Sequence, residues 1–385
     1  MFQRQLDELR ENYLYRTLNI LDYLPGSSTH VKLHDKEYIL YCSNDYLGLS
    51  HHPRIISVVR DVVDEYGLGS GASRLISGST SWHKRLEEKI ASFKRKEEAL
   101  IFSSGYLANL GIITALTDKD SLLIVDKLDH ASVIDACKLS EATLRVFPHK
   151  NMSKLETILS HSHKYNRTLI VTDSVFSMDG DFAPLGELVK LKEKFGAMLM
   201  IDEAHAMGVI GRRGSGLAEA LGLEERIDII MGTLSKATGS LGGYCAASPD
   251  IINYLKNKSR PFIYTTSLPP SLCAASYEAL LIIEGESGLR DRLWENTNFL
   301  KKNIREIGFD TGESESPIVP IILGTSDKAL KAAQYLFDSN IYIPAVRPPT
   351  VPKGKARLRL TVSAVHTDDD LKYLLSILKK MHEEI

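Results

Sequence analysis

Five short apolar runs, separated from one another by helix-like segments, constrain the fold of this chain more than any other feature. They occupy residues 122–125, 144–147, 169–172, 198–201 and 227–231. The runs are apolar throughout and do not alternate with polar residues, which is the pattern of strands covered on both faces. Apolar residues at helical spacing mark the buried face of an intervening helix, for example in residues 186–195. This repeat predicts an α/β fold with a mostly parallel central sheet.

The two ends of the chain lack this regular repeat of strands and helices. Apolar residues recur at helical spacing in residues 1–24, and Pro25-Gly26 follows them, so we expect a helix there. Two strand-like pieces come next, at 31–33 and 38–42. The sequence thus begins with a segment, 1–48, of one helix and short strands.

Beyond residue 270 long helix-like stretches dominate, with a few strands between and after them. The helix-like stretches are 270–284 and 289–307, and the strand-like pieces are 318–323 and 356–363. We therefore expect a large α/β domain at 49–270, followed by a smaller α+β domain at 271–385.

Composition excludes several classes of protein. With 385 residues the chain is too long for one small core. Its formal net charge of -2 gives no support to a nucleic-acid or membrane-surface role. The early acidic residues do not fit a signal peptide, and no apolar run is long enough to span a membrane, so we expect a cytoplasmic protein. The cysteines lack C-x-x-C spacing and are expected to be buried reduced thiols rather than disulfides or zinc ligands: Cys42, Cys137, Cys245 and Cys273.

Two of the apolar runs are followed by residues with marked chemistry. Asp202-Glu-Ala-His205 follows the run 198–201, and Lys236 lies among small residues just after the run 227–231. Ligands bind at the carboxyl ends of strands in parallel sheets. A lysine can form a Schiff base with the aldehyde of pyridoxal phosphate, and a carboxylate can pair with its ring nitrogen. Taken singly, Asp202 also suits a helix N-cap and Lys236 a solvated surface position.

A helicase interpretation of Asp202-Glu-Ala-His205 requires a Walker loop. The only Gly-Lys pair, Gly354-Lys355, lacks the other residues of that motif. Gly67-Leu-Gly-Ser-Gly71 does not follow a convincing strand, so it predicts a substrate or interface loop rather than a dinucleotide fingerprint. An NTPase function is therefore not expected.

Three further patterns leave a functional and a structural interpretation open. Ser103-Ser-Gly-Tyr106 precedes a good helix and suits either a phosphate or plain capping. His130 follows a strand and could be catalytic or structural. In residues 356–363, alternation places Arg357 and Arg359 on one face, which suits either solvent or a substrate carboxylate.

Several motifs in one order resemble the α-oxoamine synthase family, within the aspartate-aminotransferase-like fold (fold type I of the pyridoxal phosphate enzymes). The resemblance covers nearly the whole chain. It rests on Asn44-Asp-Tyr-Leu-Gly48, Gly69-Ser-Gly71, Phe176-Ser-Met-Asp-Gly-Asp181, Asp202-Glu-Ala-His205, Thr233-Leu-Ser-Lys236 and Arg357-Leu-Arg359. The family joins an amino acid to an acyl thioester and releases carbon dioxide.

The resemblance implies pyridoxal phosphate as cofactor and a role for each matching residue. Lys236 is expected to form the Schiff base, Asp202 to pair with the ring nitrogen and His130 to stack on the ring, and these three are the expected catalytic residues. The other expected cofactor contacts are Gly105, Tyr106, Ser177, His205, Thr233, Thr265 and Thr266. The last two are expected to reach the phosphate of a partner subunit, which implies a homodimer.

The resemblance also implies substrates. Arg347-Pro-Pro-Thr-Val-Pro352, followed by 356–361, is similar to the members that join L-alanine to a pimeloyl thioester in biotin synthesis. The acyl donor could be pimeloyl-CoA or a pimeloyl-carrier protein. Siblings that use glycine or serine with another acyl-CoA are the alternative. An interaction protein that has lost its chemistry is not expected, because Lys236 is present. The expected substrate contacts are Arg16 (with Arg10 close by), Asn44, Thr350 and Arg359.

Overall fold

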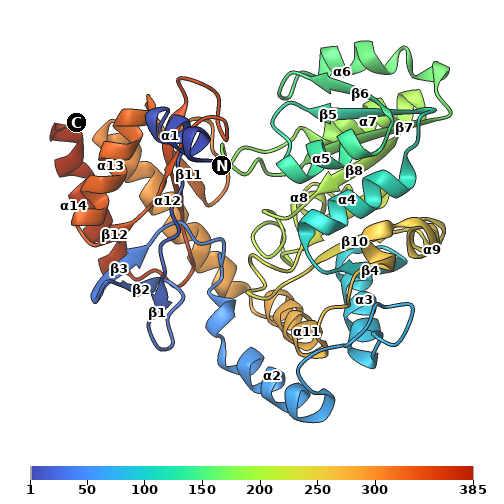
Figure 1. Ribbon diagram of the computed structural model, residues 1–385, viewed down its shortest axis with the longest axis horizontal. Coiled ribbons are helices and arrows are strands. Elements are labelled where there is room, and N and C mark those ends of the chain that lie inside the picture. The colour runs from blue at the N-terminus through green and yellow to red at the C-terminus, as the bar shows by residue number, and fades with distance from the viewer. Residues whose placement is uncertain (1, 385) are drawn as a thin grey trace. The chain divides into compact units, whose positions relative to one another are not determined.

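The computed structural model describes residues 2–384, and these divide into two compact units (Figure 1). One unit combines the described parts of Met1–Gly48 and Asp291–Ile385 with the short segment Met178–Asp181. The other comprises Leu49–Ser177 and Phe182–Arg290. We call them the terminal unit and the central unit, and we describe each by itself.

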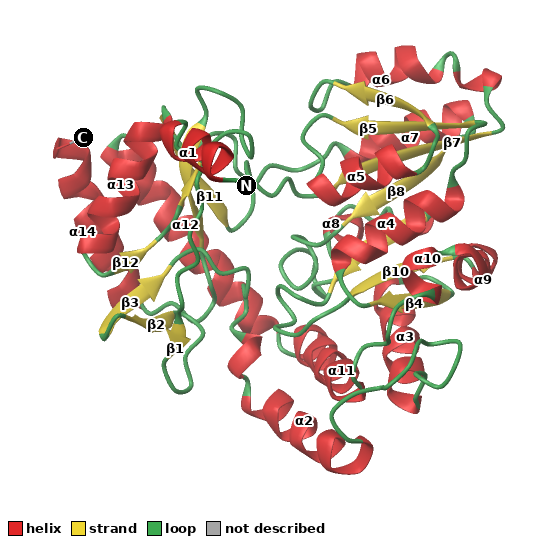
Figure 2. Ribbon diagram, in the orientation of Figure 1, coloured by secondary structure: helices red, strands yellow, loops and turns green. Residues whose placement is uncertain are grey.

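The central unit is built on a seven-stranded sheet, drawn in yellow in Figure 2. Its order is β4 (Glu98–Phe102), β10 (Gly243–Ala247), β9 (Ile229–Thr233), β8 (Met198–Asp202), β7 (Arg167–Asp173), β5 (Ser121–Asp126) and β6 (Thr143–Phe147). Only β10 runs antiparallel to its neighbours. All five apolar runs lie in strands of this sheet, so the predicted mostly parallel sheet is confirmed. Strands β4 and β10 were not predicted.

Helices surround this sheet and explain why its strands are apolar on both faces. Leu123, Val125 and Val171 belong to one core cluster together with residues of α4 and α5. The intervening residues, such as Ile124 and Ile170, are equally buried on the opposite face. The helices of this unit are α2 (Pro53–Tyr66), α3 (Ser81–Lys94), α4 (Gly105–Leu116), α5 (Ala131–Leu139), α6 (Met152–Leu159), α7 (Leu185–Phe195), α8 (Leu217–Ala220), α9 (Pro249–Lys258), α10 (Arg260–Ile263) and α11 (Pro270–Gly285), with 3-10 turns at Leu49–His51, Ser162–Lys164 and Glu224–Arg226.

The terminal unit contains two small sheets and four helices. The first sheet has the order β1 (Asp22–Tyr23), β2 (His30–Leu33), β3 (Lys36–Leu40) and β12 (Ile341–Tyr342). The second has the order β11 (Ile318–Gly324), β14 (Ala356–Thr361) and β13 (Ala345–Val346), all antiparallel. The helices are α1 (Gln3–Glu11), α12 (Ser287–Ile307), α13 (Ser326–Asp338) and α14 (Asp368–Glu384). Helix α12 begins in the central unit, whose last residue is Arg290.

The prediction of one helix over residues 1–24 is wrong. Helix α1 ends at Glu11, and Tyr13 then has a left-handed backbone, with φ of 58°. The apolar residues beyond it do not form a buried face, because Leu18 and Ile20 are 98% and 78% exposed. Helical spacing alone does not maintain a helix when no core covers its apolar stripe.

Within residues 2–384, no helix is both long and apolar enough to cross a membrane.

Candidate active site

A cavity of about 140 Å³ lies in the central unit, at the carboxyl ends of its parallel strands. Strands β7, β8 and β9 each contribute their last residue to its wall, namely Asp173, Asp202 and Thr233. The complete lining is Gly105, Tyr106, Asn109, His130, Ser132, Asp173, Val175, Asp202, Ala204, His205, Met231, Thr233 and Lys236. Seven residues predicted as cofactor contacts therefore lie around one cavity.

Lys236 and His205 meet across this cavity, with 2.8 Å between Lys236 Nζ and His205 Nε2. Each side chain comes from the loop after a strand, β9 for Lys236 and β8 for His205. The turn that carries Lys236 is fixed by Thr233 Oγ1, which donates to the carbonyl of Gly242 and accepts from the N–H of Ser235. The lysine amine is thus held beside an imidazole and is half-buried.

Asp202 is buried and accepts two hydrogen bonds from groups that can only donate. Its Oδ1 accepts from the backbone N–H of Ala204 at 2.8 Å, and its Oδ2 accepts from Asn109 Nδ2 at 2.8 Å. The first bond closes a local turn and does not cap a helix, because the next helix begins only at Leu217, so the helix N-cap interpretation of Asp202 is wrong. The second comes from a different element, α4, and both favour the ionised carboxylate.

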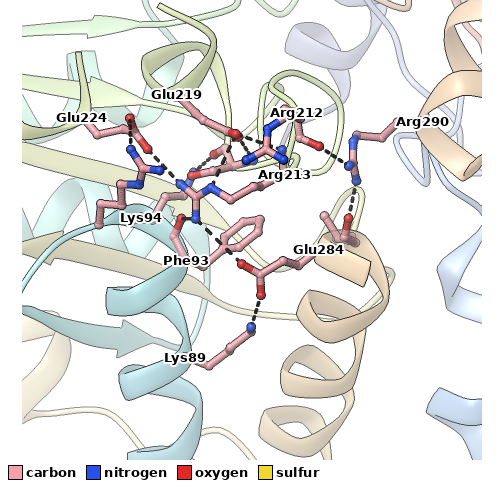
Figure 3. A network of polar contacts seen from close by, with 12 residues as sticks. Lys89, Phe93, Lys94, Arg212, Arg213, Glu219, Glu224, Glu284 and Arg290 are labelled. Atoms are coloured by element: carbon pink, nitrogen blue, oxygen red, sulfur yellow. Dashed lines mark hydrogen bonds and ion pairs between the residues drawn. The ribbon is translucent and has the colours of Figure 1, made fainter. Parts of the chain in front are cut away.

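Glu203, the next residue of the motif, belongs to a buried polar network, part of which Figure 3 shows around Lys94 and Arg213. It forms an ion pair with Lys94 on α3, with 2.6 Å between Nζ and Oε2, and both side chains are fully buried. Its other oxygen accepts from the N–H of Ala218 at 2.9 Å. The network continues through Arg213, which pairs with Glu224 at 2.9 Å. Residues of the same motif therefore have different roles. Asp202 and His205 line the cavity, and Glu203 anchors the loop that carries them.

His130 precedes helix α5 and stands at the cavity wall beside Asp173. The backbone N–H of His130 donates to Asp173 Oδ1 at 3.4 Å. Partial burial lowers the pKa of His130, and Lys236 adds to this effect while Asp202 opposes it. Burial, reinforced by the charge of Asp202, raises the pKa of Asp173 well above its ordinary value.

Gly105 and Tyr106 open helix α4 at the cavity. Ser104 caps this helix by accepting from the N–H of Leu107 at 3.2 Å, so the capping interpretation of this motif is correct. The same helix start lines the cavity, where its N–H groups and positive dipole end can attract a phosphate. A Cβ at position 105 would stand 3.2 Å from the side chain of Thr233 and narrow the space between them.

These residues fit pyridoxal phosphate. Lys236 offers an amine for the aldehyde, Asp202 an ionised carboxylate for the ring nitrogen, and helix α4 an N-terminus for the phosphate. The glycine at 105 leaves open the space that a larger side chain would fill.

Three of the predicted cofactor contacts, Ser177, Thr265 and Thr266, do not line this cavity. Ser177 lies in the loop after β7. Thr265 and Thr266 follow α10, where the carbonyl of Thr266 accepts from Ser103 Oγ at 3.2 Å. The prediction that the two threonines serve a partner subunit is consistent with this position and is not tested by it.

The four predicted substrate contacts lie in the terminal unit, in two pairs. Arg359 is 9% exposed, and both of its terminal nitrogens are 3.3 Å from Asn44 Oδ1. Arg16 Nη2 lies 3.5 Å from Thr350 Oγ1 in an open groove of the same unit. The solvated-face interpretation of 356–363 is wrong, since β14 is buried throughout and Arg357 pairs with Asp179 at 2.7 Å.

Sequence reasoning missed Asn109, Ser132 and Asp173. Asp173 had a usable signal, because it ends a buried strand in the same way as Asp202. Its register partner across β7 and β8 is Asp202 itself. Asn109 is a buried amide in a largely apolar helix, and only its contacts distinguish it from an ordinary core residue.

Comparison with known proteins agrees with this site. The family model of aminotransferase class I and II matches residues 36–378. The chain is 43% identical to the 8-amino-7-oxononanoate synthase of Thermoanaerobacter pseudethanolicus, covering 100% of this chain and 97% of the relative. It is 45% identical to the enzyme of that name from Citrifermentans bemidjiense, covering 100% and 98%.

Among solved structures, the chain resembles serine palmitoyltransferase from S. paucimobilis, which was solved with bound pyridoxal phosphate. The TM-score is 0.94 at 31% identity, and the match covers 100% of this chain and 98% of the other. The predicted fold and the predicted cofactor are thereby confirmed. The chain belongs to the aminotransferase class I and II family of pyridoxal phosphate enzymes, and within it to the α-oxoamine synthases that its motifs resemble.

Proposed function

We propose that this chain condenses L-alanine with a pimeloyl thioester to give 8-amino-7-oxononanoate, carbon dioxide and the free thiol, a step of biotin synthesis. The observation that carries this is Lys236, 2.8 Å from His205 and in one cavity with Asp202. It occurs in a chain that aligns end to end with enzymes named 8-amino-7-oxononanoate synthase. In the reaction a bond forms from Cα of alanine to the thioester carbonyl carbon, the C–S bond breaks, and the alanine carboxylate leaves as carbon dioxide.

Different cavity residues would bind the cofactor and move the proton. When bound, pyridoxal phosphate supplies an electron-accepting ring next to the substrate amine. The Lys236 amine would hold the cofactor through its aldehyde, and when free it would take the proton from Cα of L-alanine. Asp202 would keep a proton on the ring nitrogen, since an anion beside a cation favours both charges. His205 orients the Lys236 amine, and His130 would lie against the ring.

Two pairs in the terminal unit support the substrate assignment. Arg359 is held by Asn44 and by Thr361 Oγ1 at 2.9 Å, which orients a guanidinium suited to the carboxylate of L-alanine. Arg16 and Thr350 belong to a groove of about 650 Å³ with apolar walls, which suits an acyl chain. Arg347 lines this groove too, and Arg10 does not. Arg10 pairs instead with Asp7 at 2.7 Å, which favours Arg16 as the acyl contact.

A homodimer is part of the proposal. Large apolar side chains stand exposed on the loop after α2 and next to the two threonines, with Leu68, Ile76 and Tyr264 exposed by 82%, 81% and 72%. Exposed apolar side chains that cluster on a surface mark an interface. Thr265 and Thr266 adjoin Tyr264, as expected if they complete the phosphate site of a partner subunit.

The sibling activities are less well supported. The two named synthases are more similar in sequence to this chain than the serine palmitoyltransferase is. The test mixes the purified enzyme with L-alanine, glycine or L-serine and with pimeloyl-CoA, a pimeloyl-carrier protein, acetyl-CoA or palmitoyl-CoA. Thiol release and product mass are read for each pair. Preference for any pair other than L-alanine with a pimeloyl donor would move the chain to a sibling activity.

A further inference from the structure

Four side chains of the central unit form an unbroken line of hydrogen bonds from Asp202 to His130. Asn109 Nδ2 is 2.8 Å from Asp202 Oδ2 and 2.9 Å from Ser132 Oγ. Ser132 Oγ is in turn 2.7 Å from His130 Nδ1. The two middle residues are almost fully buried, at 1% exposure each, so water does not compete for the bonds of Asn109, whereas His130 at the end of the line is exposed.

The donors along this line all point the same way, because Asp202, its first member, can only accept. Asp202 Oδ1 already accepts from the N–H of Ala204, and Asp202 Oδ2 faces the amide of Asn109. If the amide were turned around, Asn109 Oδ1 would face that carboxylate, and two acceptors would repel each other. The nitrogen therefore faces Asp202, and its second hydrogen points to Ser132. Among residues 2–384, Asn109 Oδ1 has no hydrogen-bond partner, so only the nitrogen holds this side chain in place.

The direction passes on through Ser132. A hydroxyl has one hydrogen, and Ser132 Oγ accepts from Asn109, so its hydrogen is available for His130 Nδ1. The backbone N–H of Ser132 also points to Nδ1, at 3.2 Å. Two donors converge on this ring nitrogen, which must then present its lone pair. The ring hydrogen lies on Nε2.

We propose that Asn109 and Ser132 are positioning residues that fix Asp202 as a carboxylate and His130 as the neutral imidazole with its hydrogen on Nε2. One chain of hydrogen bonds would then fix both Asp202, the partner of the cofactor's ring nitrogen, and His130, the residue that stacks on its ring. His130 would offer a donor, not an acceptor, from the side of the ring that Ser132 does not contact. This inference goes beyond the proposed reaction and does not depend on which acyl donor is used.

Other groups near His130 do not impose this tautomer. The charges that act on it are Asp202, Lys236 and Asp135, and its backbone N–H faces Asp173. Asp135 is engaged with Tyr106 Oη at 2.7 Å. Charges favour or disfavour a proton on the ring, but only a directed hydrogen bond selects between Nδ1 and Nε2.

The test uses nuclear magnetic resonance of ring-¹⁵N-labelled histidine in the full-length protein, with the cofactor loaded and with it removed. His130 is assigned from the signal that is missing in His130→Gln. We expect the Nε2–H form in the original chain. Ser132→Ala should mix the two tautomers and raise the pKa of His130 by about 1, the size of one lost hydrogen bond to the neutral ring. Ser140→Ala is the matched control, because it removes a buried hydroxyl at the end of the same helix, where Ser140 Oγ donates to the Cys137 carbonyl and accepts from the N–H of Ala142.

The decisive variant is Asn109→Asp, which keeps the side-chain shape. An acid at 109 would share a proton with Asp202, and its other oxygen would accept the Ser132 hydrogen and withdraw it from His130, so the pKa of His130 should rise. Any charge that the pair gains could also act through space, and the double variant Asn109→Asp with Ser132→Ala separates the two effects. A much smaller rise in the Ser132→Ala background supports the relay. A rise of equal size in both backgrounds, or a Nδ1–H ring in the original chain, overturns it. Both readouts are independent of turnover, so they stand whether or not the proposed reaction is found.

Discussion

At the scale of single residues, the site depends on one covalent anchor. Lys236→Ala removes the only amine among the cavity residues, so turnover should be abolished. Reduction with borohydride followed by peptide mass analysis should find the cofactor on the Lys236 peptide of the original chain and on no peptide of the variant. Lys258→Ala, at the exposed end of α9, is the control and should keep both labelling and activity. Labelling of Lys236→Ala would show that another lysine carries the cofactor.

Asp202→Asn tests the charge at the ring nitrogen. The amide nitrogen of the new residue would face either the Ala204 N–H or Asn109 Nδ2, both donors, so the variant loses a hydrogen bond as well as the charge. We expect kcat to fall at least about a hundredfold, or roughly 3 kcal/mol of barrier. Steady-state assays of thiol release measure this. Asp228→Asn, whose carboxylate pairs with Lys192 outside the cavity, provides the comparison. Unchanged turnover in Asp202→Asn would show that Asp202 serves only to hold the local turn.

The residues predicted from sequence were those whose type and place in the chain agree. Lys236, Asp202 and His205 follow apolar strands, and the ends of parallel strands meet at one edge of a sheet. Asn109 and Ser132 gave no such signal, because a buried amide in a helix and a serine in its first turn are common in any core. Their importance arises from which atoms they join, and this depends on packing between α4 and α5.

At the scale of elements, the loop after β8 is held by the buried pair Lys94–Glu203. Lys94→Met keeps the length of the side chain and leaves Glu203 buried without its cation. Removing one partner of a buried pair costs about 3–5 kcal/mol. Urea unfolding should therefore show a loss of this size. Lys84→Met, on the same helix, breaks an exposed pair with Glu88 at 3.7 Å and should change stability by no more than about 0.5 kcal/mol. Equal losses in the two variants would contradict the anchoring role.

The elements were predictable where burial and pattern coincide. The five strands of the central sheet were found because both of their faces are covered. Strand β10, Gly243–Ala247, was missed because small residues around Tyr244 give no strong apolar signal. Strand β4 was missed although its residues 99–102 are apolar and offered a usable signal. The helix predicted over 1–24 was too long, because helical spacing of apolar residues does not show whether a core is present to bury them. No residue of α1 is buried.

At the scale of the whole molecule, stability should fall as the solution is acidified below neutrality. His83 in the central unit and His366 in the terminal unit are buried, and burial lowers the pKa of each to about 4. An unfolded histidine has a pKa of about 6.5. Between these values the unfolded chain binds more protons than the folded chain, so acid favours unfolding. Each histidine should contribute roughly 3 kcal/mol of stability at neutral pH that is lost by about pH 4.

Glutamine can replace His83 and His366 in their hydrogen bonds, and its side chain does not bind a proton in this pH range. The rings hydrogen-bond at both nitrogens, with His366 accepting from the N–H of Ser363 at 3.0 Å and lying 3.1 Å from the carbonyl of Leu40. An amide offers an acceptor and a donor at similar reach. His83→Gln and His366→Gln should each flatten the dependence of unfolding free energy on pH between about 6.5 and 4, measured by urea unfolding across that range. Exposed His163→Gln should leave the slope as it is. If the slope persists in both buried-site variants, the acid sensitivity has its origin in groups other than these two histidines.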